Sequence, residues 1–136
     1  MSKLQTTYDR TQHCTTVQEG VGKSVAAGAG PSHGGTGDEL SPLDLVGGGL
    51  ATCMLMAMGT LALRDKLNIA GTRVDIDISM TKEPIWRIGA IDLTFNMPQN
   101  FPTEARLKLE RAADACPIKH SFHPDTTVSA SFIYPE

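Results

Sequence analysis

The longest apolar segment of the chain covers residues 45–63, where nineteen consecutive positions carry no charged side chain. Ser41, Pro42 and Asp44 precede it as an N-cap, a first helical residue and the acidic member of a capping box. The pattern therefore predicts a long helix over 41–67. Because no face of this helix is charged, we expect other parts of the protein to cover it on nearly every side.

Beyond this helix, apolar and polar residues alternate, which is typical of a strand with one face in the core and the other in water. The alternation runs through residues 74–80 and again through 86–97, with a Lys-Glu-Pro turn between the two stretches. Two such stretches joined by a short turn indicate an antiparallel hairpin over 73–97.

A helical stripe and a final alternating stretch follow the hairpin. Four residues spaced i, i+4, i+7 and i+11 form the stripe: Ala105, Leu109, Ala112 and Cys116. They predict an amphipathic helix over 103–116, which Thr103 can cap and Pro117 ends. The alternation near the C-terminus predicts a closing strand over 126–134.

The first forty residues are of a different kind. Residues 4–27 are rich in Thr and Val and predict short strands, whereas residues 28–40 hold five glycines and a proline and predict a loop. Strands, a long helix, a hairpin, a helix and a strand give an α+β fold, in which helices pack on a largely antiparallel sheet. A length of 136 residues fits a single domain over 1–136.

Composition and charge exclude several classes of partner. The chain has 12 Lys and Arg against 15 Asp and Glu and is only 5% aromatic, so no nucleic-acid partner is expected. The apolar run has the length of a membrane span, but its glycines and threonines favour a buried helix, and no membrane role is expected. The N-terminus does not have the pattern of a signal peptide, and the three widely spaced cysteines indicate a reducing cytoplasm.

The thiols are the first candidates for chemistry. Cys53 lies within the apolar helix and Cys116 on the inward stripe of the second helix, so the two could meet if both helices pack on one face of the sheet. Two inert buried cysteines are an equally balanced alternative. A reactive thiolate needs a cation nearby and a carboxylate to orient that cation. Asp44 is a candidate carboxylate, and the sequence leaves three candidate cations open: Arg10, Arg73 and Arg87.

Other kinds of site are disfavoured. A metal site built from Cys14, Cys53, Cys116 and the histidines would need C-x-x-C or H-x-x-x-H spacing, and neither occurs, so no metal is expected. The loop GGTGDEL lacks the phosphate-binding pattern, and its acidic residues would repel a phosphate. We expect no cofactor.

Three segments in this order resemble the OsmC/Ohr family of osmotically inducible and organic-hydroperoxide-resistance proteins. They are SPLDLVGGGLATCMLMAMG, the hairpin, and a helix that ends in ACPIKHSF. The resemblance extends over roughly residues 8–134. It implies an OsmC-like fold with a long central helix and a second helix, in an intertwined homodimer whose interface holds the active sites. A partner chain would then cover the apolar helix.

The resemblance also implies a thiol-dependent peroxidase of the antioxidant response. Cys53 would reduce an organic hydroperoxide and become a sulfenic acid, which Cys116 would resolve to a disulfide that an external dithiol reduces. An arginine, expected from the N-terminal strands, and a glutamate would activate Cys53. Arg10 is the only arginine before residue 64, and Asp44 is the acidic residue at the start of the long helix.

One departure from the family pattern motivates a second hypothesis. In the hydroperoxide-resistance branch a glutamate directly follows the proline, where this chain has Leu43, and the acidic residue Asp44 stands one position later. That shift turns the side chain by about 100° on a helix. The alternative is therefore a non-catalytic dimer of the same fold that binds an apolar ligand or senses redox state.

Overall fold

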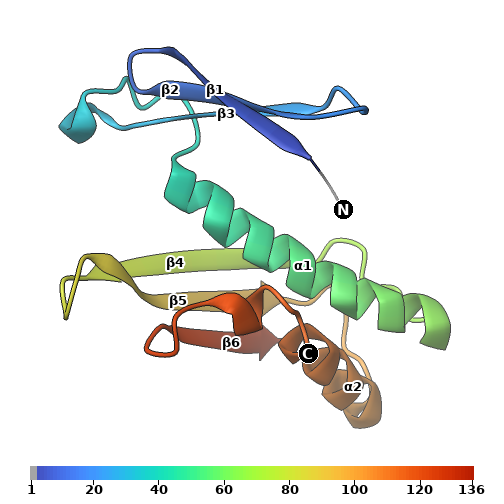
Figure 1. The fold of residues 1–136 in the computed structure, drawn as a ribbon. Coiled ribbons are helices and arrows are strands. Elements are labelled where there is room, and N and C mark those ends of the chain that lie inside the picture. The colour runs from blue at the N-terminus through green and yellow to red at the C-terminus, as the bar shows by residue number, and fades with distance from the viewer. Residues whose placement is uncertain (1–2) are drawn as a thin grey trace. The chain divides into compact units, whose positions relative to one another are not determined.

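The computed structural model of the protein describes residues 3–136, and the chain divides into two compact units, residues 1–46 and 47–136 (Figure 1). The first unit holds the strands β1 (Leu4–Arg10), β2 (His13–Gln18) and β3 (Ser24–Gly28), followed by a 3₁₀ turn, η1, at Pro31–His33. The second unit holds most of the helix α1 (Pro42–Asp65) and all later elements.

The first unit is an antiparallel sheet in the order β1-β2-β3. Every residue of β1 is exposed, and Leu4, Tyr8 and Val25 present large apolar side chains to the outside. Among residues 3–46 the one buried polar residue is His13, whose Nδ1 lies 2.5 Å from Oδ1 of Asp9. The described part of this unit therefore has almost no apolar core of its own.

Local hydrogen bonds set both ends of α1. The amide N–H of Ser41 donates to Oδ2 of Asp44 at 2.9 Å, and the amide N–H of Asp44 donates to the Ser41 hydroxyl at 3.1 Å. This reciprocal pair is the capping box that the sequence predicts. At the other end Lys66 has a φ of +56°, and the N–H of Leu67 donates to the carbonyl of Ala62 at 2.8 Å. The left-handed residue ends the helix at Asp65, before the predicted Leu67.

The second unit is built on a sheet in the order β4-β5-β6, with strands at Arg73–Thr81, Arg87–Asn96 and Thr127–Ile133. β4 and β5 pair antiparallel and form the predicted hairpin. β6 lies parallel to β5, so the sheet is mixed, while the other strand pairings of both units are antiparallel. The fold is α+β, as the sequence predicts.

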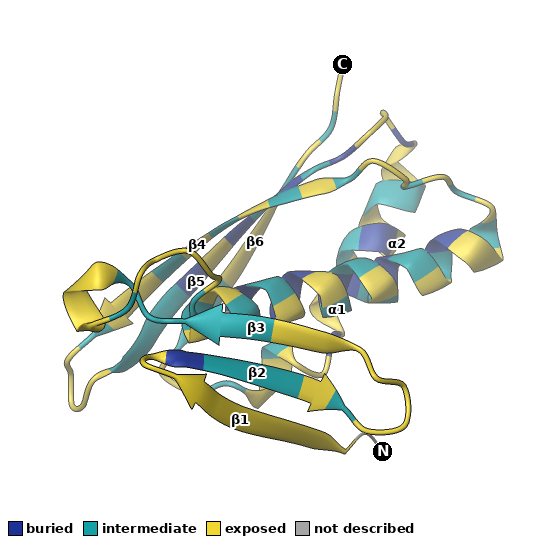
Figure 2. Ribbon diagram, turned by 90° about the horizontal axis from the view of Figure 1, so that it is seen from above, coloured by how far each residue is buried: buried dark blue, intermediate teal, exposed yellow. Residues whose placement is uncertain are grey.

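Both helices of the second unit cover one face of this sheet (Figures 1 and 2). The fully buried residues come from both helices, from the central strand β5 and from the segment after the second helix. They are Leu50, Met54 and Met58 of α1, Leu109 and Ala113 of the helix α2 (Thr103–Asp114), Ile91, Leu93 and Phe95 of β5, and Cys116, which follows α2. α1 approaches β4 closely at Gly47, where an added Cβ would lie 2.8 Å from Cδ1 of Ile78.

The structure corrects three details of the predicted second helix. Pro102, and not Thr103, occupies the N-cap position, and no side chain caps this end. The helix ends at Asp114, so Cys116 lies two residues beyond it, in the segment that leads to a 3₁₀ turn, η2, at Lys119–Ser121. The buried position of the last turn is Ala113, while Ala112 is half-buried.

Candidate functional site

Cys53 and Cys116 both belong to the second unit, and both are free thiols. Cys53 lies beside the buried stripe of α1 and is half-buried, packed against the core. Cys116 is 0% exposed and belongs to the core cluster itself. The Cys53 thiol lies close enough to Cys116 to raise the pKa of Cys116. The structure therefore brings together the pair of cysteines that the sequence places on two different elements.

The surroundings of the two thiols are not equivalent. Burial raises the pKa of Cys116 above its ordinary value, and the neighbouring Cys53 raises it further. The backbone N–H groups of Lys119 and Ile118 act in the opposite direction and lower this pKa in part. The net effect keeps the proton on Cys116, so that its S–H is available as a donor to the Cys53 sulfur.

The segment after Cys116 folds into a tight turn. The N–H of Ser121 donates to the carbonyl of Ile118 at 3.0 Å, and the Ser121 hydroxyl donates to the carbonyl of Pro117 at 2.8 Å. His120 contacts the carbonyl of Asp114 through Nε2 at 2.8 Å. The Ser121 bonds close the turn on itself, and the His120 contact ties it to the end of α2, where helix carbonyls would otherwise lack partners.

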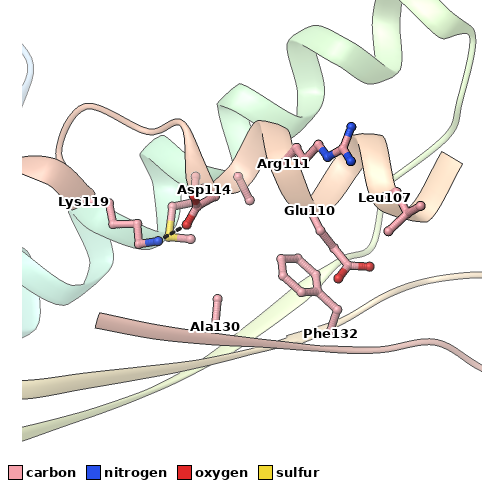
Figure 3. A pocket seen from close by; sticks show the side chains of 9 residues that line it. Leu107, Glu110, Arg111, Asp114, Lys119, Ala130 and Phe132 are labelled. Atoms are coloured by element: carbon pink, nitrogen blue, oxygen red, sulfur yellow. Dashed lines mark hydrogen bonds and ion pairs between the residues drawn. The ribbon is translucent and has the colours of Figure 1, made fainter. Parts of the chain in front are cut away.

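A cavity of about 370 Å³ lies between α2 and β6 (Figure 3). Its apolar lining comes from Met54, Leu107, Ala113, Ala130 and Phe132, and its charged lining from Glu110, Arg111, Asp114 and Lys119. Figure 3 shows the Lys119 side chain turned toward Asp114, with which it forms an ion pair. An apolar cavity with charged groups at its rim suits an amphipathic ligand.

Asp44 and Arg10 have their described contacts in the first unit. The Oδ2 atom of Asp44 accepts the capping bond from Ser41. Arg10 ends β1, is exposed, and lines a cavity of about 230 Å³ together with Asp38 and Glu39.

The other two arginines considered lie in the second unit. Arg73 pairs with Asp75 at 3.4 Å. Arg87 is half-buried and donates through Nη1 to the carbonyl of Ile88, and its buried Nε has no hydrogen-bond partner among the described residues.

The four apolar residues expected to surround a peroxide differ in accessibility. Leu50 and Met54 are fully buried in the core, although Met54 contributes to the cavity beside α2. Met56 is 68% exposed and Phe122 is half-buried against the core. Cys14 lies in β2, in register with Tyr8 and Ala27. Within residues 3–136 no three His, Cys, Asp or Glu side chains are grouped so that they could hold a metal ion.

Sequence reasoning missed Asp114 and Lys119. In the sequence both are ordinary charged positions, yet the structure pairs them across the segment that holds Cys116. The available signal was Pro117: a proline directly after a cysteine ends the helix and forces a turn, so residues just before and after it come together.

Comparison with known proteins places this geometry in a family. A family profile described as OsmC-like protein matches residues 35–131. A search of curated protein sequences gave no match.

α1 is long and apolar enough to cross a membrane by length and composition, a criterion that core helices of soluble proteins also meet.

Solved structures share the fold over nearly the whole chain. A protein of Psychrobacter arcticus 273-4, described as an osmotic stress induced and detoxification response protein, superposes with a TM-score of 0.91 at 24% identity, covering 98% of this chain and 96% of that one. An organic hydroperoxide resistance protein OsmC of Legionella pneumophila superposes with a TM-score of 0.74 at 16% identity, covering 97% of this chain and 96% of that one. The organic hydroperoxide resistance protein OhrB of Bacillus subtilis superposes with a TM-score of 0.69 at 17% identity, covering 98% of both chains. At these identities the likeness establishes the fold, and together with the profile match it shows that the chain belongs to the OsmC-like protein family.

Proposed function

We propose that the protein is a thiol-dependent peroxidase that reduces organic hydroperoxides. The observation that carries the proposal is the neighbouring pair of free thiols, of which Cys53 is half-buried against the core and Cys116 is fully buried within it. A peroxide arriving from solvent meets Cys53 first. Structures of the same fold are named for organic hydroperoxide resistance, which supports this class of substrate.

The first step is a two-electron oxidation of Cys53. Its thiolate attacks the terminal peroxide oxygen, an S–O bond forms as the O–O bond breaks, and the alkoxide takes up a proton and leaves as the alcohol. The Cys116 S–H, which burial keeps protonated, is a donor beside the reacting sulfur.

The second step joins the two sulfurs. The Cys116 thiol loses its proton and attacks the sulfur of the Cys53 sulfenic acid, so an S–S bond forms, the S–O bond breaks, and the hydroxyl leaves with the proton as water. An external dithiol then reduces the disulfide by thiol–disulfide exchange and restores both thiols.

Activation of Cys53 requires a cation held in place by a carboxylate. The resemblance implies an arginine from the N-terminal strands and an acidic residue from the first turn of the long helix. Arg10 of β1 and Asp44 of α1 match those descriptions, and we assign the two roles to them. The second oxygen of Asp44, Oδ1, is available for this because the capping bond uses Oδ2.

We also propose a homodimer in the cytoplasm. α1 exposes large apolar side chains, with Met56 at 68% and Leu63 at 85%, and an added Cβ at Gly59 would meet no neighbouring atom. The sheet of the first unit lacks a core of its own. Exposed apolar area of this kind is stabilised by burial against a partner, and a second copy supplies complementary surfaces.

The test is steady-state turnover of cumene hydroperoxide with a dithiol reductant. Cys53→Ser should abolish turnover, and Cys116→Ser should form a sulfenic acid that persists, detected by mass spectrometry after trapping. Cys14→Ser is the matched control and should retain the wild-type rate. Full turnover by Cys53→Ser would refute the proposal. Slow, ordinary oxidation of Cys53 without a Cys53–Cys116 disulfide would favour the non-catalytic binder or redox sensor.

A further inference from the structure

His13 lies between two carboxylates, one at each nitrogen of its imidazole ring. Its Nδ1 atom is 2.5 Å from Oδ1 of Asp9 in β1, and its Nε2 atom is 3.5 Å from Oε1 of Glu39 in the loop before α1. The side chain of His13 is only 10% exposed. The first contact is a hydrogen bond, whereas the second is too long for one, and Nε2 has no hydrogen-bond partner among the described residues.

Asp9 determines which ring nitrogen carries a proton. Its other oxygen, Oδ2, accepts the hydroxyl of Thr15 at 2.6 Å, and the hydrogen bonds from Thr15 and His13 hold the pKa of Asp9 below its ordinary value. Asp9 therefore remains a carboxylate, which accepts and does not donate, so Nδ1 of His13 carries the hydrogen of their shared bond. In the neutral ring the other nitrogen, Nε2, then holds a lone pair and no proton.

The backbone places Glu39 against this lone pair. His13 pairs with Gly28 of β3, and an added Cβ at Gly28 would lie 3.6 Å from Cβ of Glu39, so the Glu39 side chain lies over the glycine. The N–H of Gly28 donates to the carbonyl of Leu40 at 2.9 Å, which joins the segment before α1 to β3. When the ring is neutral, two acceptors therefore face each other at this junction, and no hydrogen bond forms between them.

We propose that His13 is a proton-operated latch: when the ring takes up a proton, its Nε2–H donates to Glu39 and ties the loop before α1 to the sheet of β1, β2 and β3. The protonated ring then donates to a carboxylate from each nitrogen, in two charge-assisted hydrogen bonds. When the ring loses that proton, the bond to Glu39 is lost and the bond to Asp9 remains. The latch thus closes in acid and opens as the pH rises.

Two further charged groups line the cavity of about 230 Å³ beside His13. They are Arg10 of β1 and Asp38 of the loop. Arg10 disfavours a positive charge on the ring and Asp38 favours one, so their effects oppose each other. Asp9 and Glu39 lie at the ring nitrogens and have the larger influence, because the interaction of two charges weakens with distance. The charges nearest to the ring are therefore negative on both sides.

The latch joins the two segments to which the proposed function assigns the activating pair. Asp9 adjoins Arg10 in β1, and Glu39 precedes α1, whose first turn holds Asp44. A protonated ring holds these two segments together. The latch itself involves no thiol chemistry, so it is tested without peroxide.

The test follows urea denaturation of the full chain between about pH 5 and pH 8, the range in which histidine ordinarily changes its charge. The Glu39 side chain is 37% exposed, so its replacement leaves the core intact. Glu39→Gln keeps the size of the side chain, and its amide N–H donates to the lone pair of the neutral ring. Glu39→Gln should therefore be less stable than wild type at the acidic end of the range and more stable at the alkaline end.

The size of the acidic effect follows from the kind of bond that is lost. A hydrogen bond between charged groups changes the equilibrium constant of unfolding by about tenfold or more. Glu39→Ala makes no bond to Nε2 in either state of the ring, so it should lose this stability in acid and differ little from wild type at the alkaline end. Comparing variants at the same pH cancels the contributions of all other titrating groups.

Hydrogen exchange of the Gly28 amide reports the junction directly, because that N–H is bonded to Leu40. After correction for the intrinsic effect of pH, its protection in wild type should fall as the pH rises, and His13→Gln should abolish this fall. Asp38→Asn is the matched control. It removes a carboxylate that lines the same cavity but is not one of the two at the ring nitrogens, and it should keep the fall.

Two results would overturn the inference. One is a Glu39→Gln variant whose stability lies on the same side of wild type at both ends of the range. The other is a protection of the Gly28 amide that does not change with pH in wild type. If Cys53 never forms a sulfenic acid, the proposed function fails, and these two measurements still decide the latch.

Discussion

Asp44 caps α1, and we assign it a second role in the activation of Cys53; a pair of substitutions separates the two. Its Oδ2 accepts the N–H of Ser41 at 2.9 Å, which stabilises the start of α1, and its charge is the carboxylate that we assign to orient Arg10. Asp44→Ala removes both functions. Asp44→Asn keeps an oxygen that can accept the capping bond and removes only the charge.

The size of the stability effect follows from the geometry. Loss of a capping bond costs about 1 kcal/mol, and loss of a negative charge in the first helical turn costs about 0.5 kcal/mol. Asp44 is exposed, so water solvates the Ser41 N–H in the variant and no burial cost is added. We expect Asp44→Ala to lower the free energy of unfolding by about 1.5 kcal/mol and Asp44→Asn by about 0.5 kcal/mol. The Ser41 hydroxyl in turn accepts the N–H of Asp44 at 3.1 Å, so the two residues act as a unit. The double variant Ser41→Ala, Asp44→Ala should therefore lower the free energy of unfolding by less than the sum of the two single variants.

The assay combines urea denaturation at a fixed protein concentration with single-turnover oxidation of Cys53. If the charge of Asp44 orients the activating arginine, Asp44→Asn should oxidise on the order of tenfold more slowly despite its nearly unchanged stability. An Asp44→Asn variant that oxidises at the wild-type rate would show that Asp44 only caps the helix. An Asp44→Ala variant of unchanged stability would refute the capping argument itself.

Two further predictions concern the face that α1 buries and the face that it exposes. Gly48→Ala should raise the free energy of unfolding by about 0.5–1 kcal/mol, because the added Cβ would meet no neighbouring atom. Gly47→Ala should lower it, because the added Cβ would lie 2.8 Å from Cδ1 of Ile78. Melting temperatures that shift in the same direction in both variants would contradict this. Leu63→Asp should convert the proposed dimer to a monomer with native circular dichroism, measured by light scattering, and a variant that remains dimeric would place the interface elsewhere.

The elements that the sequence predicts well are those with local determinants. The capping box at Ser41 and Asp44 uses hydrogen bonds within four residues, so the start of α1 could be placed from sequence alone. Its end could not, because Lys66 adopts a left-handed φ that glycine usually signals. The direction of β6 was equally hidden, since the same alternation of residues serves a parallel or an antiparallel neighbour.

The candidate site was predictable at the level of its thiols and not at the level of their environment. The inward position of Cys116 follows from the helical stripe of α2, whose periodicity extends past the end of the helix at Asp114. The position of Cys53 follows only from its place in a uniformly apolar helix, so the sequence could not assign it to one face. The positions of the amides at residues 118 and 119 depend on the dihedral angles of a turn after Pro117, and no periodicity encodes these. The pairing of Lys119 with Asp114 depends on that same turn.

The unequal burial of the two thiols has a consequence for the reductive half of the proposed cycle. In the disulfide, an external dithiol from solvent reaches the half-buried Cys53 sulfur and not the fully buried Cys116 sulfur, so Cys116 must be the leaving group. A leaving thiol departs more slowly as its pKa rises, and burial raises the pKa of Cys116. Access and leaving ability therefore oppose each other at this residue. The backbone N–H groups of Ile118 and Lys119 lower this pKa in part, which favours departure of the buried thiol.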